Sequence, residues 1–217
     1  MKKTHLPELL DFIMTTEGLK TLMRHSWLSS GRRESVAEHT WRMAMMALVL
    51  VPELQLTYNV DKLLTMILIH DVPEIKAGDT PAFKKRTNKH ALEKKALAAL
   101  TANLPAVTRQ KFMELWLEFE ANQTIEAQIA HALDKLEVLI QHNQAATKTW
   151  SKKERTPQYS IYYGDEFCEF NQTLKLLKQL VRVDTAQKLG MKISTKIIDL
   201  HNPSSSPPYL KGRDSLS

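Results

Sequence analysis

The spacing of apolar side chains constrains this chain more than any other feature of its sequence. Apolar residues recur three and four positions apart, as on one face of a helix, and the strict alternation of a half-buried strand is absent. Only 6 glycines punctuate 217 residues, and no segment repeats at a fixed spacing. These features predict an all-α fold, and this length suits one compact domain.

Two helices have well-defined ends in the sequence. Ser35 and Glu38 have the spacing of a capping box, and the apolar run that follows continues to Val51. A second helix is expected from about Asp61 to His70 or Asp71. Pro73 interrupts it, and the segment 74–77 adds about one turn before Gly78.

The remaining helices are expected with less definite ends. They cover about residues 89–103, 105–120, 124–147, 165–181 and 185–189, whereas 79–88 and 150–164 lack helical signals. We expect one domain over residues 1–201. The segment 202–217 contains Pro203, three consecutive serines and two further prolines, and is expected to be a disordered tail.

Composition excludes several classes of protein. The longest uninterrupted apolar run, Met43 to Val51, is far shorter than the ~20 residues that cross a bilayer, so no membrane association is expected. Cys168 is the single cysteine and cannot form an internal disulfide, and no secretory leader is recognisable. A cytoplasmic protein is expected.

The net charge of +6 would attract anions from nucleotides to RNA, but identifies no partner by itself.

Four polar residues lie on predicted helices: His39, the adjacent pair His70 and Asp71, and Asp134. His39, His70 and Asp134 each share a helix face with apolar neighbours. The helix of Asp134 is apolar on two sides, as expected of a central helix. A buried carboxylate without a partner costs at least several kcal/mol, and a cation would offset that cost. Two imidazoles and two carboxylates suit a borderline divalent transition metal better than calcium or magnesium.

Each of these residues also has a simpler interpretation. His39 could be a hydrogen-bonded histidine near a helix start, Asp71 could cap the turn near Pro73, and Asp134 could pair with Lys135 or a nearby arginine. One cation would explain all four at once. The hypothesis therefore depends on their convergence.

The segments 34–39 and 70–74, then Gly78-Asp79 and Asp134, resemble the HD-domain phosphohydrolases, and most of all their 5′-deoxynucleotidase branch, over roughly residues 18–145. The resemblance implies a helical bundle of the HD type in which His39, His70, Asp71 and Asp134 bind the metal. It also implies that Glu74 and Asp79 lie beside the substrate and that Arg24 orients the phosphate.

The sugar-binding residues match the family less closely. One branch has tryptophan directly after the arginine, where this chain has His25, and another has an Arg-x-x-Trp arrangement like Arg24 to Trp27. The resemblance therefore implies Trp27 and His25 as contacts to the substrate and leaves the choice between deoxyribose and ribose open. Asp79 and Thr80 can hydrogen-bond sugar hydroxyls or phosphate, although a simple turn also explains them.

Phosphomonoester hydrolysis at neutral pH needs an activated water and neutralisation of the phosphate charge, and a divalent metal supplies both. Glu74, one turn after His70, is the predicted acid/base; the alternative is an exposed carboxylate at a helix end. The planar guanidinium of Arg24 would bind the phosphate; the alternative is a surface salt bridge. His131 is interpreted as a histidine outside the metal set, and Trp116, Phe112 and Phe119 as core.

We therefore expect a metal-dependent phosphomonoesterase that hydrolyses nucleoside 5′-monophosphates, with deoxynucleotides foremost, using Co²⁺, Mn²⁺, Zn²⁺, Fe²⁺ or Ni²⁺. On this hypothesis no nucleic acid binds. The resemblance also suggests a homodimer, although no apolar stripe identified in the sequence marks an interface. One alternative is an HD hydrolase of another phosphate ester or of a nucleoside polyphosphate. The other is a non-catalytic, metal-stabilised module with a basic, RNA-binding surface.

Overall fold

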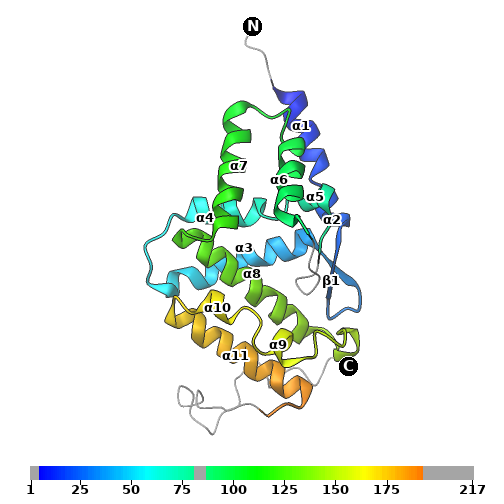
Figure 1. Cartoon of the computed structure of the whole chain (residues 1–217), viewed down its shortest axis with the longest axis vertical. Helices are drawn as coiled ribbons and strands as arrows, with labels where there is room; N and C mark the ends of the chain where they lie inside the picture. The colour runs from blue at the N-terminus through cyan, green and yellow to red at the C-terminus, as the bar shows by residue number, and fades with distance from the viewer. Residues whose placement is uncertain (1–4, 81–86, 193–217) are drawn as a thin grey trace.

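The structure is a computed structural model that describes residues 5–80 and 87–192, and helices dominate it (Figure 1). The predicted all-α class is confirmed, with one small two-stranded sheet in addition. In chain order the elements are α1 (Leu6–Thr15), α2 (Gly18–Thr21), β1 (Met23–Trp27), β2 (Arg33–Ser35), α3 (Val36–Leu50), η1 (Val51–Leu54), α4 (Val60–Ile69), α5 (Glu74–Ala77), α6 (Lys89–Leu100), α7 (Ala106–Ala121), α8 (Ile125–Gln144), η2 (Thr147–Thr149), α9 (Pro157–Ser160), α10 (Asp165–Cys168) and α11 (Gln172–Leu189).

Helix α8 lies at the centre of the bundle. It packs against α3, α4 and α7 and also against α10, α11 and β1. In Figure 1, α6 and α7 stand at one end of the molecule and α10 and α11 lie at the other, with α8 between them. Ile129, Leu133 and Leu136 are completely buried, and each contributes about 1.5–3 kcal/mol through removal of its side chain from water. The central position predicted for this helix is confirmed.

The start of α3 is fixed by the predicted capping box. The hydroxyl of Ser35 accepts a hydrogen bond from the Glu38 backbone N–H, and the Glu38 carboxylate accepts one from the Ser35 backbone N–H at 2.8 Å. Two N–H groups that the first turn leaves unpaired are thereby satisfied. This arrangement places His39, in the first turn of α3, completely inside the protein.

The predicted break between α4 and α5 is also present. Helix α4 ends at Ile69, and Pro73 precedes the single turn of α5. Gly78 then ends that turn with φ of 78°, a conformation that favours glycine. His70 and Asp71 therefore lie in the turn between two short helices, and Glu74 lies one turn further on.

The hairpin of β1 and β2 was not expected from the sequence. The two strands pair antiparallel, and the buried residues of β1 are Arg24 and Ser26. The inward-facing residues of β1 are polar. The strand therefore lacks the alternation of apolar and polar residues by which a strand is recognised in a sequence. The hairpin lies against the centre of the molecule, since β1 contacts α8.

Helical segments differ from the expected ones at both ends of the described chain. Helices α1 and α2 were not predicted, and the short α9 lies in a segment expected to lack helix. The helix expected over 165–181 is divided, because the Asn171 side chain accepts hydrogen bonds from the backbone N–H groups of Thr173 and Leu174 and caps α11. Helix α11 then continues to Leu189, so the separate helix expected over 185–189 is its last part.

The predicted tail, 202–217, lies outside the described residues, so the domain boundary at residue 201 stays a prediction. Over the residues that the structure does describe, no helix is both long enough and apolar enough to cross a membrane.

Candidate active site

The four candidate metal ligands converge from three parts of the chain. His39 comes from α3, His70 and Asp71 from the turn after α4, and Asp134 from α8. His39 Nε2 lies 3.3 Å from Asp134 Oδ1 and 3.9 Å from Asp71 Oδ2, and His70 Nε2 lies 3.2 Å from Asp71 Oδ2. Metal bonds of 2.0–2.2 Å place neighbouring ligand atoms roughly 3 Å apart, so these separations suit a shared cation.

Both imidazoles are oriented by the hydrogen bond of the other ring nitrogen. His39 Nδ1 donates to Glu137 Oε2 at 2.5 Å, and His70 Nδ1 donates to the carbonyl oxygen of Ile67 at 2.7 Å. These bonds leave the Nε2 lone pair of each ring directed at the cluster, which is the arrangement that metal-binding histidines need.

Three donor atoms of the cluster are buried without a hydrogen-bond partner among the described residues. They are His39 Nε2, His70 Nε2 and Asp71 Oδ2. Buried polar atoms are ordinarily paired, because leaving one unpaired costs about 1–3 kcal/mol. A divalent transition metal would satisfy all three together, so these residues fit such an ion by donor type, separation and lack of other partners.

Asp134 has contacts that agree with both interpretations considered for it, a metal ligand and a partner of Lys135. Its Oδ2 accepts a hydrogen bond from Lys135 Nζ at 2.6 Å, while its Oδ1 faces His39. Burial opposes the negative charge, but Lys135 and His39 hold the pKa of Asp134 well below its ordinary value. Asp134 is therefore an ionised carboxylate with one oxygen directed at the cluster.

Arg24 is buried beside the cluster instead of lying at the surface. Its Nη1 lies 3.5 Å from Asp71 Oδ2, and its Nε lies 3.5 Å from Glu34 Oε2. Burial opposes the charge on the guanidinium, but Asp71 and Asp79 outweigh that effect and raise the pKa of Arg24 above its ordinary value. The structure thus holds a permanent cation next to the candidate metal ligands, and the surface salt bridge considered for Arg24 does not apply.

Glu74 is also buried, with an exposed fraction of 4%, and its Oε2 has no hydrogen-bond partner among the described residues. Burial, and then the charge of Asp71, raise the pKa of Glu74 to about 9. Burial likewise raises the pKa of Asp79. The Glu74 carboxyl therefore keeps its proton at neutral pH, and the exposed helix-end carboxylate considered for it does not apply.

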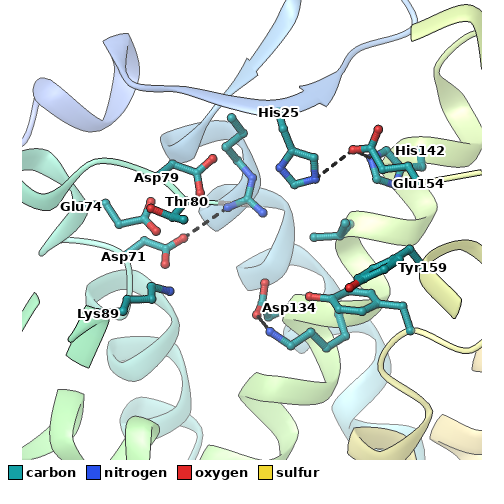
Figure 2. A pocket seen from close by; sticks show the side chains of 14 residues that line it. His25, Asp71, Glu74, Asp79, Thr80, Lys89, Asp134, His142, Glu154 and Tyr159 are labelled. Carbon is teal, nitrogen blue, oxygen red and sulfur yellow. Dashed lines mark hydrogen bonds and ion pairs between the residues drawn. The ribbon is translucent and has the colours of Figure 1, made fainter. Parts of the chain in front are cut away.

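One cavity unites most of the predicted site (Figure 2). Arg24, His25, Asp71 and Asp134 line it together with Glu74, Asp79 and Thr80. In Figure 2, Glu74 and Asp79 lie beside Asp71 on one side of the cavity, with Asp134 across from them. The structure therefore brings the predicted phosphate, proton-transfer and metal residues to one place.

Trp27 is placed differently from the other predicted residues. It is not among the residues that line the cavity, and its ring lies 4.6 Å from the guanidinium carbon of Arg33. Its backbone carbonyl accepts a hydrogen bond from Gln141 Nε2. His25, and not Trp27, is the ring that β1 contributes to the cavity.

Glu137 is the functional residue that the sequence interpretation missed most clearly. It is completely buried, orients His39 and is neutralised by the guanidinium of Arg42. Its position three residues after Asp134, on the same side of a helix with two apolar stripes, was a detectable signal. Tyr163, which also lines the cavity, had no comparable signal, whereas Lys135 was considered as a partner of Asp134.

The residues interpreted as structural occupy structural positions. Trp116 and Phe119 are buried in the core, with Phe112 packed against it. His131 Nε2 hydrogen-bonds the Phe119 carbonyl oxygen at 2.8 Å, outside the candidate metal cluster. Cys168 is buried, and burial raises the pKa of its thiol to about 11.

Comparison with known proteins gives related proteins of one kind. A family model described as "HD domain" matches residues 16–173. The protein named 5′-deoxynucleotidase HDDC2 from Homo sapiens is 34% identical over 140 residues, which cover 63% of this chain and 67% of that protein. Its namesake from Dictyostelium discoideum is 34% identical over 141 residues, covering 61% and 74%.

Solved structures share the fold. A predicted metal-dependent phosphohydrolase from Magnetospirillum magnetotacticum MS-1 superposes with a TM-score of 0.76 at 29% identity, covering 87% of this chain and 96% of that one. A conserved hypothetical protein from Pyrococcus furiosus has a TM-score of 0.62 at 28% identity, covering 80% and 99%. The residues that the family model matches include all four candidate ligands, Arg24 and Glu74.

Proposed function

Because this chain belongs to the HD domain family, we propose that it is a metal-dependent phosphohydrolase that converts nucleoside 5′-monophosphates, deoxynucleotides foremost, into nucleoside and phosphate. The observation that carries the proposal is the group of buried donor atoms on His39, His70 and Asp71 that lack a hydrogen-bond partner among the described residues, beside the buried cation of Arg24. The substrate class comes from the relatives that are named 5′-deoxynucleotidases.

The family implies a divalent metal ion, and His39, His70, Asp71 and Asp134 would hold it. When bound, such an ion lowers the pKa of a coordinated water toward neutrality and offsets charge on the phosphoryl group. Mixed nitrogen and oxygen donors suit Co²⁺, Mn²⁺, Zn²⁺, Fe²⁺ or Ni²⁺, and we propose one of these.

Arg24 binds and orients the phosphate in this proposal. Its guanidinium presents parallel N–H donors that match two phosphoryl oxygens, and its contacts with Asp71 and Glu34 hold it in place before substrate arrives. Negative charge that spreads over the phosphoryl oxygens in the transition state is stabilised by this fixed cation.

Glu74 moves the proton. Water attacks phosphorus as the bond from phosphorus to the 5′ oxygen breaks, and the protonated carboxyl of Glu74 donates its proton to that leaving oxygen. The resulting carboxylate then accepts the proton that the attacking water loses, so Glu74 is regenerated. Asp79, Thr80 and His25 also line the cavity, and in this proposal they contact the sugar.

The proposal is tested by phosphate release from a panel of deoxy- and ribonucleoside 5′-monophosphates with Co²⁺, Mn²⁺ or Zn²⁺ added. We expect release with at least one metal and its loss in His70→Ala, with an unchanged circular dichroism spectrum. His90→Ala, which changes an exposed histidine on α6 that does not line the cavity, should keep the activity. No release with any nucleotide and metal, or full activity in His70→Ala, would contradict the proposal.

We also propose a homodimer formed through the outer face of α3. Trp41, Met45, Leu48 and Val49 recur at helical spacing there and are between 41% and 65% exposed. A contiguous apolar stripe of this kind on a surface helix is typical of a protein interface. A cytoplasmic location suits a nucleotide substrate and a chain whose single cysteine, Cys168, is a buried thiol.

A further inference from the structure

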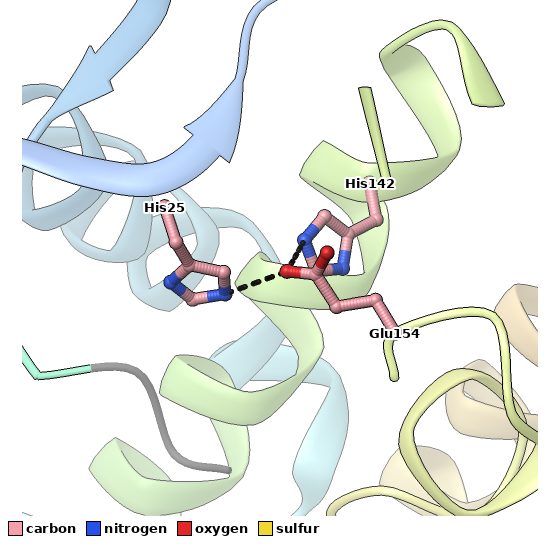
Figure 3. Close-up of side chains that lie close together, drawn as sticks. All are labelled: His25, His142 and Glu154. Carbon is pink, nitrogen blue, oxygen red and sulfur yellow. Dashed lines mark ion pairs between the residues drawn. The ribbon is translucent and has the colours of Figure 1, made fainter. Parts of the chain in front are cut away.

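A second cluster of metal-ligand side chains lines the same cavity, apart from the four candidate ligands His39, His70, Asp71 and Asp134. It consists of His25 on β1, His142 near the end of α8, and Glu154 in the turn before α9 (Figure 3). In Figure 2 these three side chains lie together, on the other side of the cavity from Asp71 and Glu74. None of the three belongs to the proposed metal set of the phosphohydrolase site.

The distances within this cluster suit a shared cation better than hydrogen bonds. Glu154 Oε1 lies 3.4 Å from His25 Nε2 and 3.5 Å from His142 Nε2. Good N–H···O hydrogen bonds measure about 2.7–3.2 Å. A tetrahedral ion with bonds of about 2.0–2.1 Å separates its ligand atoms by roughly 3.3–3.4 Å, which is close to the separations found.

The Glu154 carboxylate is held in place by hydrogen bonds on the side away from the two imidazoles. Glu154 Oε2 accepts a hydrogen bond from the Ser151 backbone N–H at 2.5 Å, and the Glu154 backbone N–H donates to Ser151 Oγ at 3.2 Å. This pair of bonds leaves Oε1 directed at the two imidazoles, as Figure 3 shows. Glu154 is buried, so its orientation is fixed by the protein and not by solvent.

The imidazole of His142 is also held by its neighbours. His142 is buried on α8, and its ring centroid lies 5.2 Å from that of Trp150. Trp150 Nε1 donates to the His142 carbonyl oxygen at 3.0 Å, which ties the segment after α8 back to the helix. The first imidazole, His25, comes from the hairpin that also positions Arg24, and its ring packs edge-on against His142 at 5.6 Å.

We propose that His25, His142 and Glu154 form a second divalent-metal site, with the ligand set that zinc prefers. Two histidines and one glutamate are a recognised ligand set for zinc, and three protein ligands leave one coordination position for water or substrate. Because all three residues line the cavity, that open position is available to an oxygen or nitrogen of the bound substrate. This inference goes beyond the proposed function and does not depend on it.

The test counts zinc ions per chain after chelation, reloading with zinc chloride and gel filtration. We expect about two zinc ions in the wild type and about one in His70→Ala, because that variant loses only the first site. Adding His142→Gln or Glu154→Gln to His70→Ala should remove the remaining zinc. His131→Gln in the same background is the matched control, since His131 also lies on α8 but outside both clusters.

A spectroscopic measurement separates bound metal from metal held loosely at the surface. Co²⁺ replacing zinc in His70→Ala should give the visible absorption of a low-coordinate cobalt site, and that absorption should disappear when His142→Gln or Glu154→Gln is added. Circular dichroism confirms that each variant is folded. The inference is overturned if folded His70→Ala holds no zinc, or if its zinc content does not change with either added substitution. Neither result depends on phosphate release, so the proposed function can fail or succeed separately.

Discussion

At the scale of single residues, the charged side chains of the candidate site are buried beside side chains of opposite charge. Glu137, on α8, is neutralised by Arg42 and in turn holds His39 through the ring nitrogen that faces away from the cluster. Arg24 is held in the same way by Glu34 and Asp71. His39 and Arg24 are therefore fixed before substrate binds, which lowers the cost of organising the transition state.

Substitution Glu74→Gln should remove proton transfer while preserving shape. Because the pKa of Glu74 is raised to about 9, its acid form predominates at neutral pH and is lost as the pH rises through about 9. We therefore expect wild-type kcat to fall above that pH. The variant should lose roughly 10²–10⁴-fold in kcat and should lack this alkaline fall. Exposed Glu114→Gln is the control, and an unchanged kcat in Glu74→Gln would remove Glu74 from the mechanism.

Substitution Arg24→Lys keeps the charge but removes the planar pair of donors. We expect kcat/KM for nucleoside monophosphates to fall on the order of 10²-fold, because an ammonium group cannot bind two phosphoryl oxygens in parallel. Steady-state phosphate release measures the effect. Arg109→Lys, an exposed change on α7, should leave kcat/KM unaltered. A fully active Arg24→Lys would show that charge alone suffices at this position.

At the scale of helices and strands, the sequence predicts those elements whose ends have a local chemical cause. The start of α3 at Ser35 and the break at Pro73 could be predicted, because each depends on neighbouring residues and their backbone groups. The hairpin could not be predicted from local patterns, because Arg24 and Ser26 form its buried face and Arg24 contacts Asp71, which lies far along the chain. Local sequence patterns do not show which distant residue will neutralise a buried polar side chain.

The turn before α10 meets α8 at a position that tolerates only glycine. A Cβ at Gly164, where φ is 77°, would lie 2.5 Å from Lys135 Cβ. Gly164→Ala should therefore destabilise the fold by about 1–3 kcal/mol through overpacking, in addition to about 1–2 kcal/mol of backbone strain at its positive φ, and should lower activity by displacing Lys135 from Asp134. Urea denaturation measures the loss of stability.

Gly190→Ala is the matched control for this substitution. Gly190 also has positive φ, at 64°, but none of the described residues lies within 4 Å of the added Cβ. It should cost only the backbone strain of about 1–2 kcal/mol and leave activity intact. Equal effects of the two substitutions on both stability and activity would show that contact with Lys135 is unimportant.

At the scale of the whole molecule, apolar periodicity was sufficient to predict the all-α class and the central position of α8. The four candidate ligands could be identified as inward-facing, but their convergence could not, because it depends on how α3, α4 and α8 cross. The hairpin residue Arg24 was found through family resemblance, whereas Glu137, His142 and Glu154 were recognised only once packing was known. Side chains that act through a partner elsewhere leave little local signal.

The outer face of α3 provides the test of oligomeric state. Trp41→Glu places a charge in the exposed apolar stripe, so we expect a dimeric wild type and a monomeric variant with the same circular dichroism spectrum. Light scattering coupled to gel filtration measures the mass. Val107→Glu, at an even more exposed apolar position on α7, should leave the dimer intact. A monomeric wild type would exclude the interface.

The central claim is that His39, His70, Asp71 and Asp134 hold one catalytic divalent ion. Its most direct test is phosphate release by chelated protein as Co²⁺ or Mn²⁺ is added back, with bound metal measured in the same samples. Activity should vanish on chelation and return in proportion to metal bound by the wild type, and should not return in His70→Ala. Full activity in metal-free protein, or equal recovery in His70→Ala, would contradict the account.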